Sequence, residues 1–174
     1  MIALSLISVR ELGADDGHVL DTVFAGLSPH SRHMRFHAPI SQMTLGVRRR
    51  LADVDGRDHV ALAAFAGRGR EPVGLVRIIA VEPGRAELAV EVVDAWQGRG
   101  IGTRLLRAMK HRAAELGYHE LIAEVLAENG AVLSLLRSAF PGSTSRRCGI
   151  EITLALPVVD TAFDVSDRLT DLVA

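Results

Sequence analysis

Three glycines alternate with other residues where a strand is expected to run into a helix. They are Gly98, Gly100 and Gly102, in a segment 92–103 that reads VVDAWQGRGIGT. The first amides of a helix lack intrahelical acceptors, and the helix dipole adds positive potential at the same end. Glycines let the backbone approach a ligand without a Cβ in the way. The loop is therefore predicted to bind an anion, most commonly a phosphate.

Other types of glycine loop fit this spacing less well. A dinucleotide-binding fingerprint, with Glu124 as the ribose-binding acid, needs G-x-G-x-x-G, whereas this loop has G-x-G-x-G. A P-loop needs a lysine after its last glycine, where this chain has Thr103. A plain strand–helix turn stays open as an alternative, but three alternating glycines before a well-formed helix disfavour it. Arg99 and Arg104 are expected to add charge-assisted bonds to the anion.

The hydrophobic pattern predicts a helical opening, a meander of strands, and then alternating strands and helices. Helices are expected from about Asp15, from Ser28 and Pro29, and from Ser41 to near Leu51. Strands are expected at 2–9, 60–66, 73–81, 86–93, 121–126 and 150–156, the last paired with a short strand before Cys148. A helix ended by Gly117 and a helix capped by Asn129 fall between the later strands. This order predicts an α/β (α+β) fold with a mixed, mostly antiparallel central sheet of about six to seven strands flanked by helices.

Length and composition exclude several classes of protein. The chain has 174 residues, so residues 1–157 are expected to form a single domain and 158–174 a C-terminal tail with a short amphipathic helix. A hydrophobic content of 48% excludes a disordered chain. A net charge of -1 and an aromatic content of 4% argue against a nucleic-acid or membrane partner. The single Cys148 excludes an intrachain disulfide and a cysteine zinc site. Because no signal peptide or membrane span is evident, a cytoplasmic location is expected.

The glycine loop also carries a family resemblance. Its sequence QGRGIG at 97–102 matches the Q/R-x-x-G-x-G/A signature of GNAT-type N-acetyltransferases. Segments 86–90 and 123–129 match the strands on either side of that signature, and the likeness covers roughly residues 7–156. The chain therefore resembles this superfamily, which implies a GNAT-like acyl-CoA N-acyltransferase fold, acetyl-CoA as the acyl donor and no metal. Segment 27–36, LSPHSRHMRF, is similar more narrowly to bacterial protein-lysine (Pat-like) acetyltransferases.

The resemblance implies which residues bind the donor. The backbone of Val92 and Val93 would contact the pantetheine arm, and Asn129 would contact the cofactor, cap a helix, or do both. The residues that would wrap the pyrophosphate are Gln97, Gly98, Arg99, Gly100, Ile101, Gly102 and Thr103.

Acetyl transfer to an amine near neutral pH needs a base, because only the deprotonated amine is a nucleophile. Glu87 and Glu91 share one face of the strand that feeds the glycine loop. The resemblance implies that Glu87 is the general base, whereas Glu91 is left open as a perturbing neighbour or a simple variant. A solvated strand face is the alternative for either acid.

A general acid is harder to assign. The family often has a tyrosine that protonates the departing thiolate, and this chain has Leu136 at that position. Ser134, Ser138 or water would have to serve instead. The histidines at 30, 33 and 37 lie near one helical face, but the absence of an adjacent acid argues against a metal site.

The expected activity is therefore acetyl transfer to a primary amine, with a protein lysine as the favoured acceptor. A small-molecule amine acetyltransferase and a non-catalytic acyl-CoA-binding sensor are the alternatives, and a homodimer is left open. Arg32, Arg35 and the run at 48–50 lie on the expected acceptor side. Basic residues there would suit a protein surface with acidic residues around its target lysine.

Overall fold

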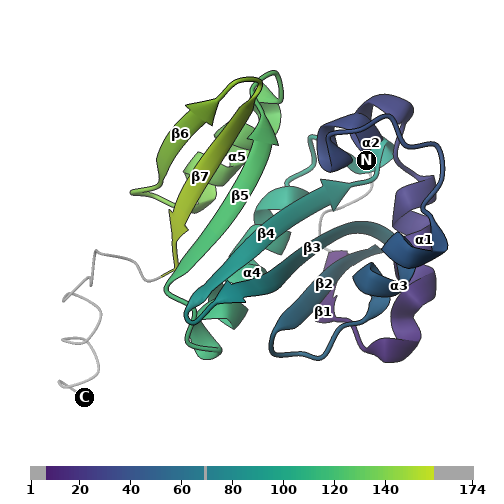
Figure 1. The fold of residues 1–174 in the computed structure, drawn as a ribbon. Helices are drawn as coiled ribbons and strands as arrows, with labels where there is room; N and C mark the ends of the chain where they lie inside the picture. The colour runs from purple at the N-terminus through teal and green to yellow at the C-terminus, as the bar shows by residue number, and fades with distance from the viewer. Residues whose placement is uncertain (1–6, 69, 159–174) are drawn as a thin grey trace, which may run out of the picture.

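A seven-stranded sheet with helices on both faces forms the molecule, as a computed structural model of residues 7–68 and 70–158 shows (Figure 1). The elements that precede the glycine loop are β1 (Ile7–Glu11), η2 (Ala14–Asp16), α1 (Gly17–Ala25), α2 (Pro29–Phe36), α3 (Leu45–Ala52), β2 (His59–Ala66), β3 (Glu71–Glu82), β4 (Arg85–Val92) and η3 (Asp94–Trp96). The elements that follow it are α4 (Ile101–Glu115), β5 (Glu120–Leu126), α5 (Gly130–Ala139), β6 (Thr144–Cys148) and β7 (Glu151–Pro157). The strand order is β1-β2-β3-β4-β5-β7-β6, which confirms the mixed, mostly antiparallel sheet expected from the sequence.

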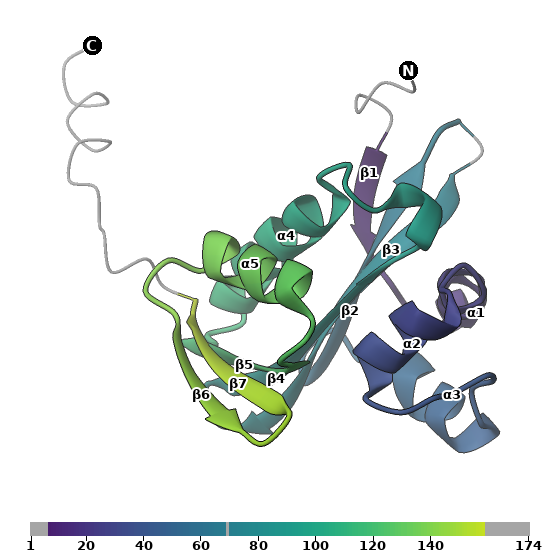
Figure 2. The same ribbon diagram turned by 90° about the horizontal axis from the view of Figure 1, so that it is seen from above.

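Helices cover the sheet from two sides, with α4 and α5 on one face and α1, α2 and α3 on the other (Figure 2). The fully buried strand β2 shows why: its alternate side chains enter two different cores. Val60, Leu62 and Ala64 pack in the core beneath α4 and α5, whereas Ala61 and Phe65 pack in the core beneath α1. A strand buried on both faces therefore reads as a continuous apolar run rather than as an alternation.

The helical opening differs from the expectation in two places. Thr44, not Ser41, caps α3, because the Thr44 hydroxyl accepts the amide hydrogen of Val47 at 3.3 Å. The residues around Asp15 form a short 3-10 turn, and α1 begins only at Gly17. The strand expected at 2–9 is seen as β1 from Ile7 onward, its first residues lying outside the described ranges, as does most of the tail expected at 158–174.

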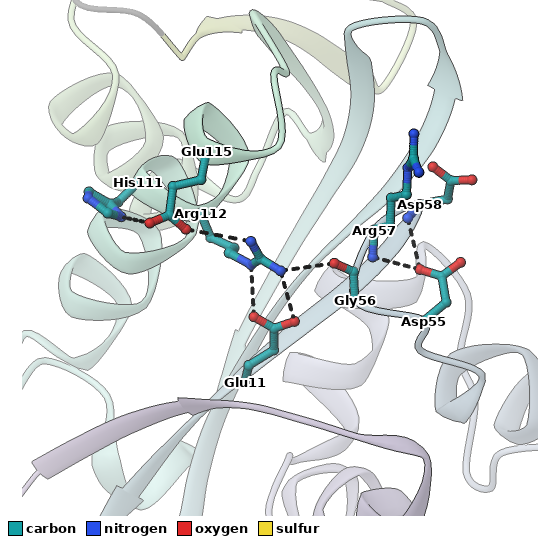
Figure 3. Close-up of polar contacts among 8 residues, drawn as sticks. All are labelled: Glu11, Asp55, Gly56, Arg57, Asp58, His111, Arg112 and Glu115. Atoms are coloured by element: carbon teal, nitrogen blue, oxygen red, sulfur yellow. Dashed lines mark hydrogen bonds and ion pairs between the residues drawn. The ribbon is translucent and has the colours of Figure 1, made fainter.

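A polar network joins the C-terminal part of α4 to the end of β1 and to the loop before β2 (Figure 3). Arg112 of α4 donates from Nε to a Glu11 carboxylate oxygen at 2.9 Å and from Nη2 to the Gly56 carbonyl at 3.0 Å. Asp55 accepts the backbone amides of Arg57 and Asp58, both at 2.8 Å, and so fixes the loop that carries Gly56. These contacts fasten the loop before β2 to α4.

Among the described helices, none is both long and apolar enough to cross a lipid bilayer.

The sheet splits between β4 and β5, which are the only parallel neighbours among the described strands. Their pairing covers three positions and ends with Glu87 opposite Ile122. Beyond Glu87, β4 stays paired with β3 as far as Val92, and β5 stays paired with β7 as far as Leu126. The two strands therefore diverge toward their carboxyl ends, as Figure 1 shows, and leave a gap in the middle of the sheet.

Candidate active site

A cavity of about 780 Å³ occupies the split between β4 and β5. Its walls come from α2, β4, the loop before α4, the first turn of α4, β5 and α5. Ligand sites in open sheets with parallel strands commonly lie beyond the carboxyl ends of those strands, where this cavity lies. Its size falls within the range of small-molecule and cofactor sites.

The glycine loop forms one end of this cavity and has the geometry of an anion site. Gly98 and Gly100 adopt left-handed backbone conformations with φ of 70° and 75°, which glycine adopts without steric cost. A Cβ added at either position would meet no atom within 4 Å, so the backbone faces open space. Gly100 is the N-cap of α4 and has no side chain to cap it, which leaves the first amides of the helix available to a ligand. These features fit a phosphate group, as the sequence predicted.

Gly102 lines the cavity, as expected of a glycine in this loop, and also lies against α5. A Cβ at Gly102 would lie 2.8 Å from Cδ2 of Leu135, so the absence of a side chain allows α4 to approach α5 closely. The glycine repeat therefore combines two requirements. Gly98 and Gly100 open the loop toward a ligand, and Gly102 serves helix packing next to it.

Most of the residues expected to hold the cofactor line the cavity. They are Val92, Gln97, Gly98, Gly100, Ile101, Gly102, Thr103 and Asn129. The Gln97 side chain donates to the Val92 carbonyl at 3.0 Å and fixes the entry to the loop. Asn129 accepts the amide hydrogen of Val132 at 3.3 Å, which confirms that it caps α5.

Three other residues expected at the cofactor lie elsewhere. The amide of Val93 donates to the Val73 carbonyl at 2.9 Å, its carbonyl accepts from Trp96 at 2.8 Å, and Val93 is absent from the cavity wall. The Arg99 guanidinium lies over the Trp96 ring, 5.0 Å from its centroid. Arg104 donates to the Ile7 carbonyl of β1 at 2.9 Å and so points away from the loop.

The two acids of β4 have different surroundings, although both line the cavity. Glu87 is exposed, and within residues 7–68 and 70–158 no hydrogen bond or ion pair engages its carboxylate. The Glu91 side chain is only 5% exposed and forms an ion pair with Arg35 of α2. Arg77 of β3 is also buried, and burial lowers its pKa to about 10, with Glu91 opposing and Arg35 reinforcing that change. Glu91 is thus a buried counter-ion, and Glu87 is the acid left free to act.

Three of the five arginines expected on the acceptor side, Arg32, Arg35 and Arg48, are engaged within the chain, whereas Arg49 and Arg50 are exposed at the end of α3. Arg35 is paired with Glu91, as above. Arg32 donates to the Ser41 carbonyl at 2.7 Å and lies over the Phe24 ring. Arg48 of α3 forms an ion pair with Asp21 of α1 at 2.6 Å. Paired charges of this kind are poorly suited to recognising an acidic partner.

No tyrosine reaches the cavity. Leu136 lines it and is buried, whereas the alternative proton donors Ser134 and Ser138 are exposed on α5 and lie outside the wall. The hydroxyl groups that do line the cavity belong to Ser31 and Thr103. In the part of the chain that the structure describes, no group of three or more His, Cys, Asp or Glu side chains is arranged to hold a metal ion.

Two residues that line the cavity were considered in the sequence only for roles that were set aside, Glu124 as a ribose-binding acid and His37 as part of a histidine cluster. Glu124 of β5 lines the cavity from the side opposite β4, and its signal was an acidic residue between the buried Ala123 and Val125. His37, which follows α2, also lines the cavity, and its Nδ1 lies 2.8 Å from a carboxylate oxygen of Glu151. The contact between His37 and Glu151 could not be predicted from the sequence, because the two residues are 114 positions apart along the chain.

Comparison with known proteins agrees with this geometry. Residues 30–140 match the family model described as acetyltransferase (GNAT) family. An acetyltransferase from Pseudomonas aeruginosa is 30% identical over 133 residues, which cover 74% of this chain and 71% of that relative. An L-methionine sulfoximine/L-methionine sulfone acetyltransferase from the same species is 34% identical over 80 residues, 46% of this chain and 41% of that protein.

Solved structures show the same fold. The GNAT domain of S. lividans PAT superposes with a TM-score of 0.77 and 30% identity, covering 86% of this chain and 89% of that one. Spermidine N-acetyltransferase from Vibrio cholerae, in complex with CoA and spermine, has a TM-score of 0.68 at 15% identity and covers 88% of this chain and 96% of that one. The family match, the fold and the glycine loop at the start of α4 lead to one conclusion. The chain belongs to the GNAT acetyltransferase family and uses acetyl-CoA as its acyl donor.

Proposed function

We propose that this enzyme acetylates the side-chain amine of a protein lysine and that Glu87 is the general base. The observation that carries the proposal is the contrast between the two acids of β4. Glu87 is exposed, faces the cavity and has no described partner, whereas Glu91 is buried against Arg35. A base that is open to solvent suits the end of a long lysine side chain presented by another protein. The resemblance of segment 27–36 to protein-lysine acetyltransferases supports the same acceptor.

The donor would be held by backbone groups. Acetyl-CoA, when bound, supplies an acetyl thioester. The amides that follow Gly98 and Gly100 would donate to its pyrophosphate, and the helix dipole of α4 would add to that attraction. Val92 and Asn129, which line the cavity between the loop and β5, would contact the rest of the donor.

The reaction itself needs a deprotonated amine near the thioester. Glu87 would accept a proton from the lysine ammonium, directly or through a water molecule, and so make the nitrogen nucleophilic. The nitrogen–carbon bond then forms, the carbon–sulfur bond breaks, and the nitrogen releases its second proton to water in the cavity. Because Leu136 cannot donate a proton to the departing sulfur, we propose that water in the cavity supplies it. Holding the amine and the thioester together contributes much of the remaining acceleration.

A small-molecule amine is the second candidate acceptor. It is favoured by the relative named L-methionine sulfoximine/L-methionine sulfone acetyltransferase, whose matching region covers 46% of this chain. That acceptor carries a carboxylate, and Arg35 is the one arginine or lysine among the described residues that line the cavity. Since Arg35 is already paired with Glu91, this candidate requires the ion pair to open.

A direct comparison of acceptors tests the proposal. The purified enzyme is given acetyl-CoA together with intact proteins, lysine peptides, free amino acids including methionine sulfone, or aliphatic amines. Release of free thiol is measured, and the products are identified by mass spectrometry. We expect kcat/KM to be highest for lysine in peptides or proteins. Efficient turnover of a free amino acid, with no acetylated lysine in any protein, would support the second candidate instead.

A further inference from the structure

Glu124 lies across the split in the sheet from the proposed base. Glu87 is paired with Ile122, and Glu124 is two residues further along β5. Residues that pair across a sheet, or alternate along a strand, lie on one face, so Glu87, Ile122 and Glu124 share a face. Their neighbours Ala86, Leu121 and Ala123 point to the opposite face, into the core beneath α4 and α5. Two residues along a strand correspond to about 7 Å, so the two acids are offset by about 7 Å along the strands, in addition to the spacing of about 4.8 Å between neighbouring strands.

The fold makes no evident use of the Glu124 carboxylate. The residue is exposed, lines the cavity and, across the described ranges, takes part in no hydrogen bond or ion pair. Other acids near the split are engaged: Glu91 with Arg35, and Glu151 with His37. Glu87 and Glu124 are therefore the two free negative charges on the face that an acceptor would approach. Like charges that face the same space repel each other, and a cation placed between or beside them relieves that repulsion.

We propose that Glu124 determines acceptor specificity by binding a second positive charge next to the amine that is acetylated. This inference rests on the proposed role of Glu87, which receives the reacting amine. Glu124 would then pair with another ammonium or guanidinium group of the same acceptor, about 7 Å away along the sheet. An acceptor with an acidic neighbour would be repelled by the same carboxylate. This preference for a basic neighbour is opposite to the preference for acidic neighbours that the arginines of segment 27–50 suggested from the sequence.

Two sources can supply this chemistry. In a protein, the second charge would be an arginine or lysine adjacent to the target lysine. In a small molecule, it would be the other end of an aliphatic diamine. Both can bring a cation near the reacting nitrogen, through the short carbon chain of the diamine or through space from the neighbouring side chain of the peptide, and matched pairs of acceptors separate them. A peptide with the core Ala-Lys-Arg is compared with Ala-Lys-Ala and Ala-Lys-Asp, and putrescine is compared with butylamine.

The variants are Glu124→Gln, which removes the charge at constant shape, and Glu124→Lys, which reverses it. Glu71→Gln, an exposed acid at the start of β3 and outside the cavity, is the matched control. The native enzyme and the control should show a KM for the Arg-flanked peptide about fivefold below that for the Ala-flanked peptide. Glu124→Gln should abolish that difference while the KM for acetyl-CoA stays unchanged, and Glu124→Lys should favour the Asp-flanked peptide. Added salt should weaken the native preference but not the residual activity of Glu124→Gln.

The outcomes separate this inference from the proposed acceptor. If only the amines are acetylated, and Glu124→Gln removes a preference for putrescine over butylamine, the Glu124 site is supported and the protein-lysine proposal fails. If peptides are acetylated with equal KM whatever the flanking charge, the protein-lysine proposal is supported and the role of Glu124 is overturned. An unchanged preference in Glu124→Lys also overturns it, provided that circular dichroism shows a native fold.

Discussion

His37, the C-cap residue that follows α2, lies with its Nδ1 2.8 Å from a carboxylate oxygen of Glu151, the first residue of β7. Two positions earlier in α2, Arg35 forms its ion pair with Glu91 of β4. The two strands belong to opposite sides of the split sheet. Helix α2 is therefore fastened to both sides and spans the cavity on the acceptor face. Under the proposed function, the position of α2 sets the width of the acceptor entrance.

Loosening this helix should affect the acceptor more than the donor. Glu151→Gln weakens the contact with His37, so we expect the KM for the acceptor to rise about two- to fivefold because a partly exposed pair of this kind contributes little. The KM for acetyl-CoA should not change. Steady-state kinetics with each substrate varied in turn measures both constants. Glu115→Gln, an exposed acid on α4 that pairs with His111, is the control and should leave both constants as they are.

Replacing Glu87 tests the proposed base. Glu87→Gln keeps the shape of the side chain but cannot accept a proton, so kcat should fall by roughly 10²–10⁴-fold. Calorimetric titration with acetyl-CoA should give an unchanged Kd. Glu91→Gln should instead lower the stability, because it leaves the Arg35 and Arg77 guanidinium groups without their buried counter-ion. A fully active Glu87→Gln beside an inactive, folded Glu91→Gln would show that the two roles are reversed.

The glycine loop allows a matched comparison of backbone strain and ligand binding. Gly100 and Gly149 both have positive φ, 75° and 60°, and a Cβ at either position would meet no atom within 4 Å. Gly100→Ala and Gly149→Ala should therefore lose similar stability, about 1–2 kcal/mol. Only Gly100→Ala should lose acetyl-CoA affinity, because Gly149 lies in the turn between β6 and β7. Equal affinities in calorimetry would contradict the assignment of the loop to the pyrophosphate.

The same test at Gly102 would give an ambiguous answer. An alanine there meets Leu135 at 2.8 Å, so a loss of binding could follow from a shift of α5. We expect Leu135→Ala to restore part of the stability lost in Gly102→Ala, as in any pair of residues that share one contact. Thermal unfolding of the two single variants and the double variant measures this coupling. If the stability lost in the double variant equals the sum of the losses in the two single variants, the alanine at position 102 does not act through Leu135.

The pH dependence of stability should report on His59. Its Nε2 lies 3.2 Å from Nη1 of Arg77, and burial lowers the pKa of His59, with the charge of Arg77 adding to that effect and Asp53 and Asp55 opposing it. The unfolded chain, in which a histidine has a pKa of about 6.5, therefore binds the proton more readily than the folded protein. The contribution of neutral His59 to the free energy of unfolding is therefore fully present above the unfolded pKa. It is lost as the pH falls through the lower pKa of the folded protein.

Urea unfolding between pH 7.5 and 5.5 measures this effect. The unfolding midpoint should decline over this range in the native protein, and His59→Gln should make the decline shallower. His111→Gln, on the exposed side of α4, should keep the native slope. If the slope is the same in all three proteins, His59 is not the group that titrates.

Arg112 should contribute to stability rather than to catalysis. It joins α4 to Glu11 and to the Gly56 carbonyl, away from the cavity (Figure 3). We expect Arg112→Met to lower the free energy of unfolding by about 1 kcal/mol and to leave kcat/KM unchanged. Arg107→Met, at an exposed position of the same helix, should cost less than about 0.5 kcal/mol. Denaturant unfolding and the thiol-release assay measure the two quantities.

The sequence by itself determined most of the elements and the glycine loop at the start of α4. Local rules decided these features: Ser28 and Asn129 cap helices as predicted, and glycines at 98 and 100 take the left-handed conformations that open the loop. Hydrophobic periodicity is equally local, so the antiparallel meander of β2, β3 and β4 could also be predicted. Each of these signals lies within a few neighbouring residues.

Only the tertiary structure decided which charges remain free on the acceptor side. Glu87 and Glu91 look equivalent along β4, but Arg35 reaches Glu91 from a helix 56 positions away and leaves Glu87 exposed. His37 meets Glu151 across 114 positions, and Glu124 faces the cavity because β5 separates from β4 beyond Ile122. An ion pair depends on distance in space, and hydrophobic burial fixes that distance through the packing of whole elements. Sequence spacing carries no record of such a pairing, so it could not show that Arg32, Arg35 and Arg48 are engaged within the chain, whereas the open backbone at Gly98 and Gly100 follows from a local glycine pattern.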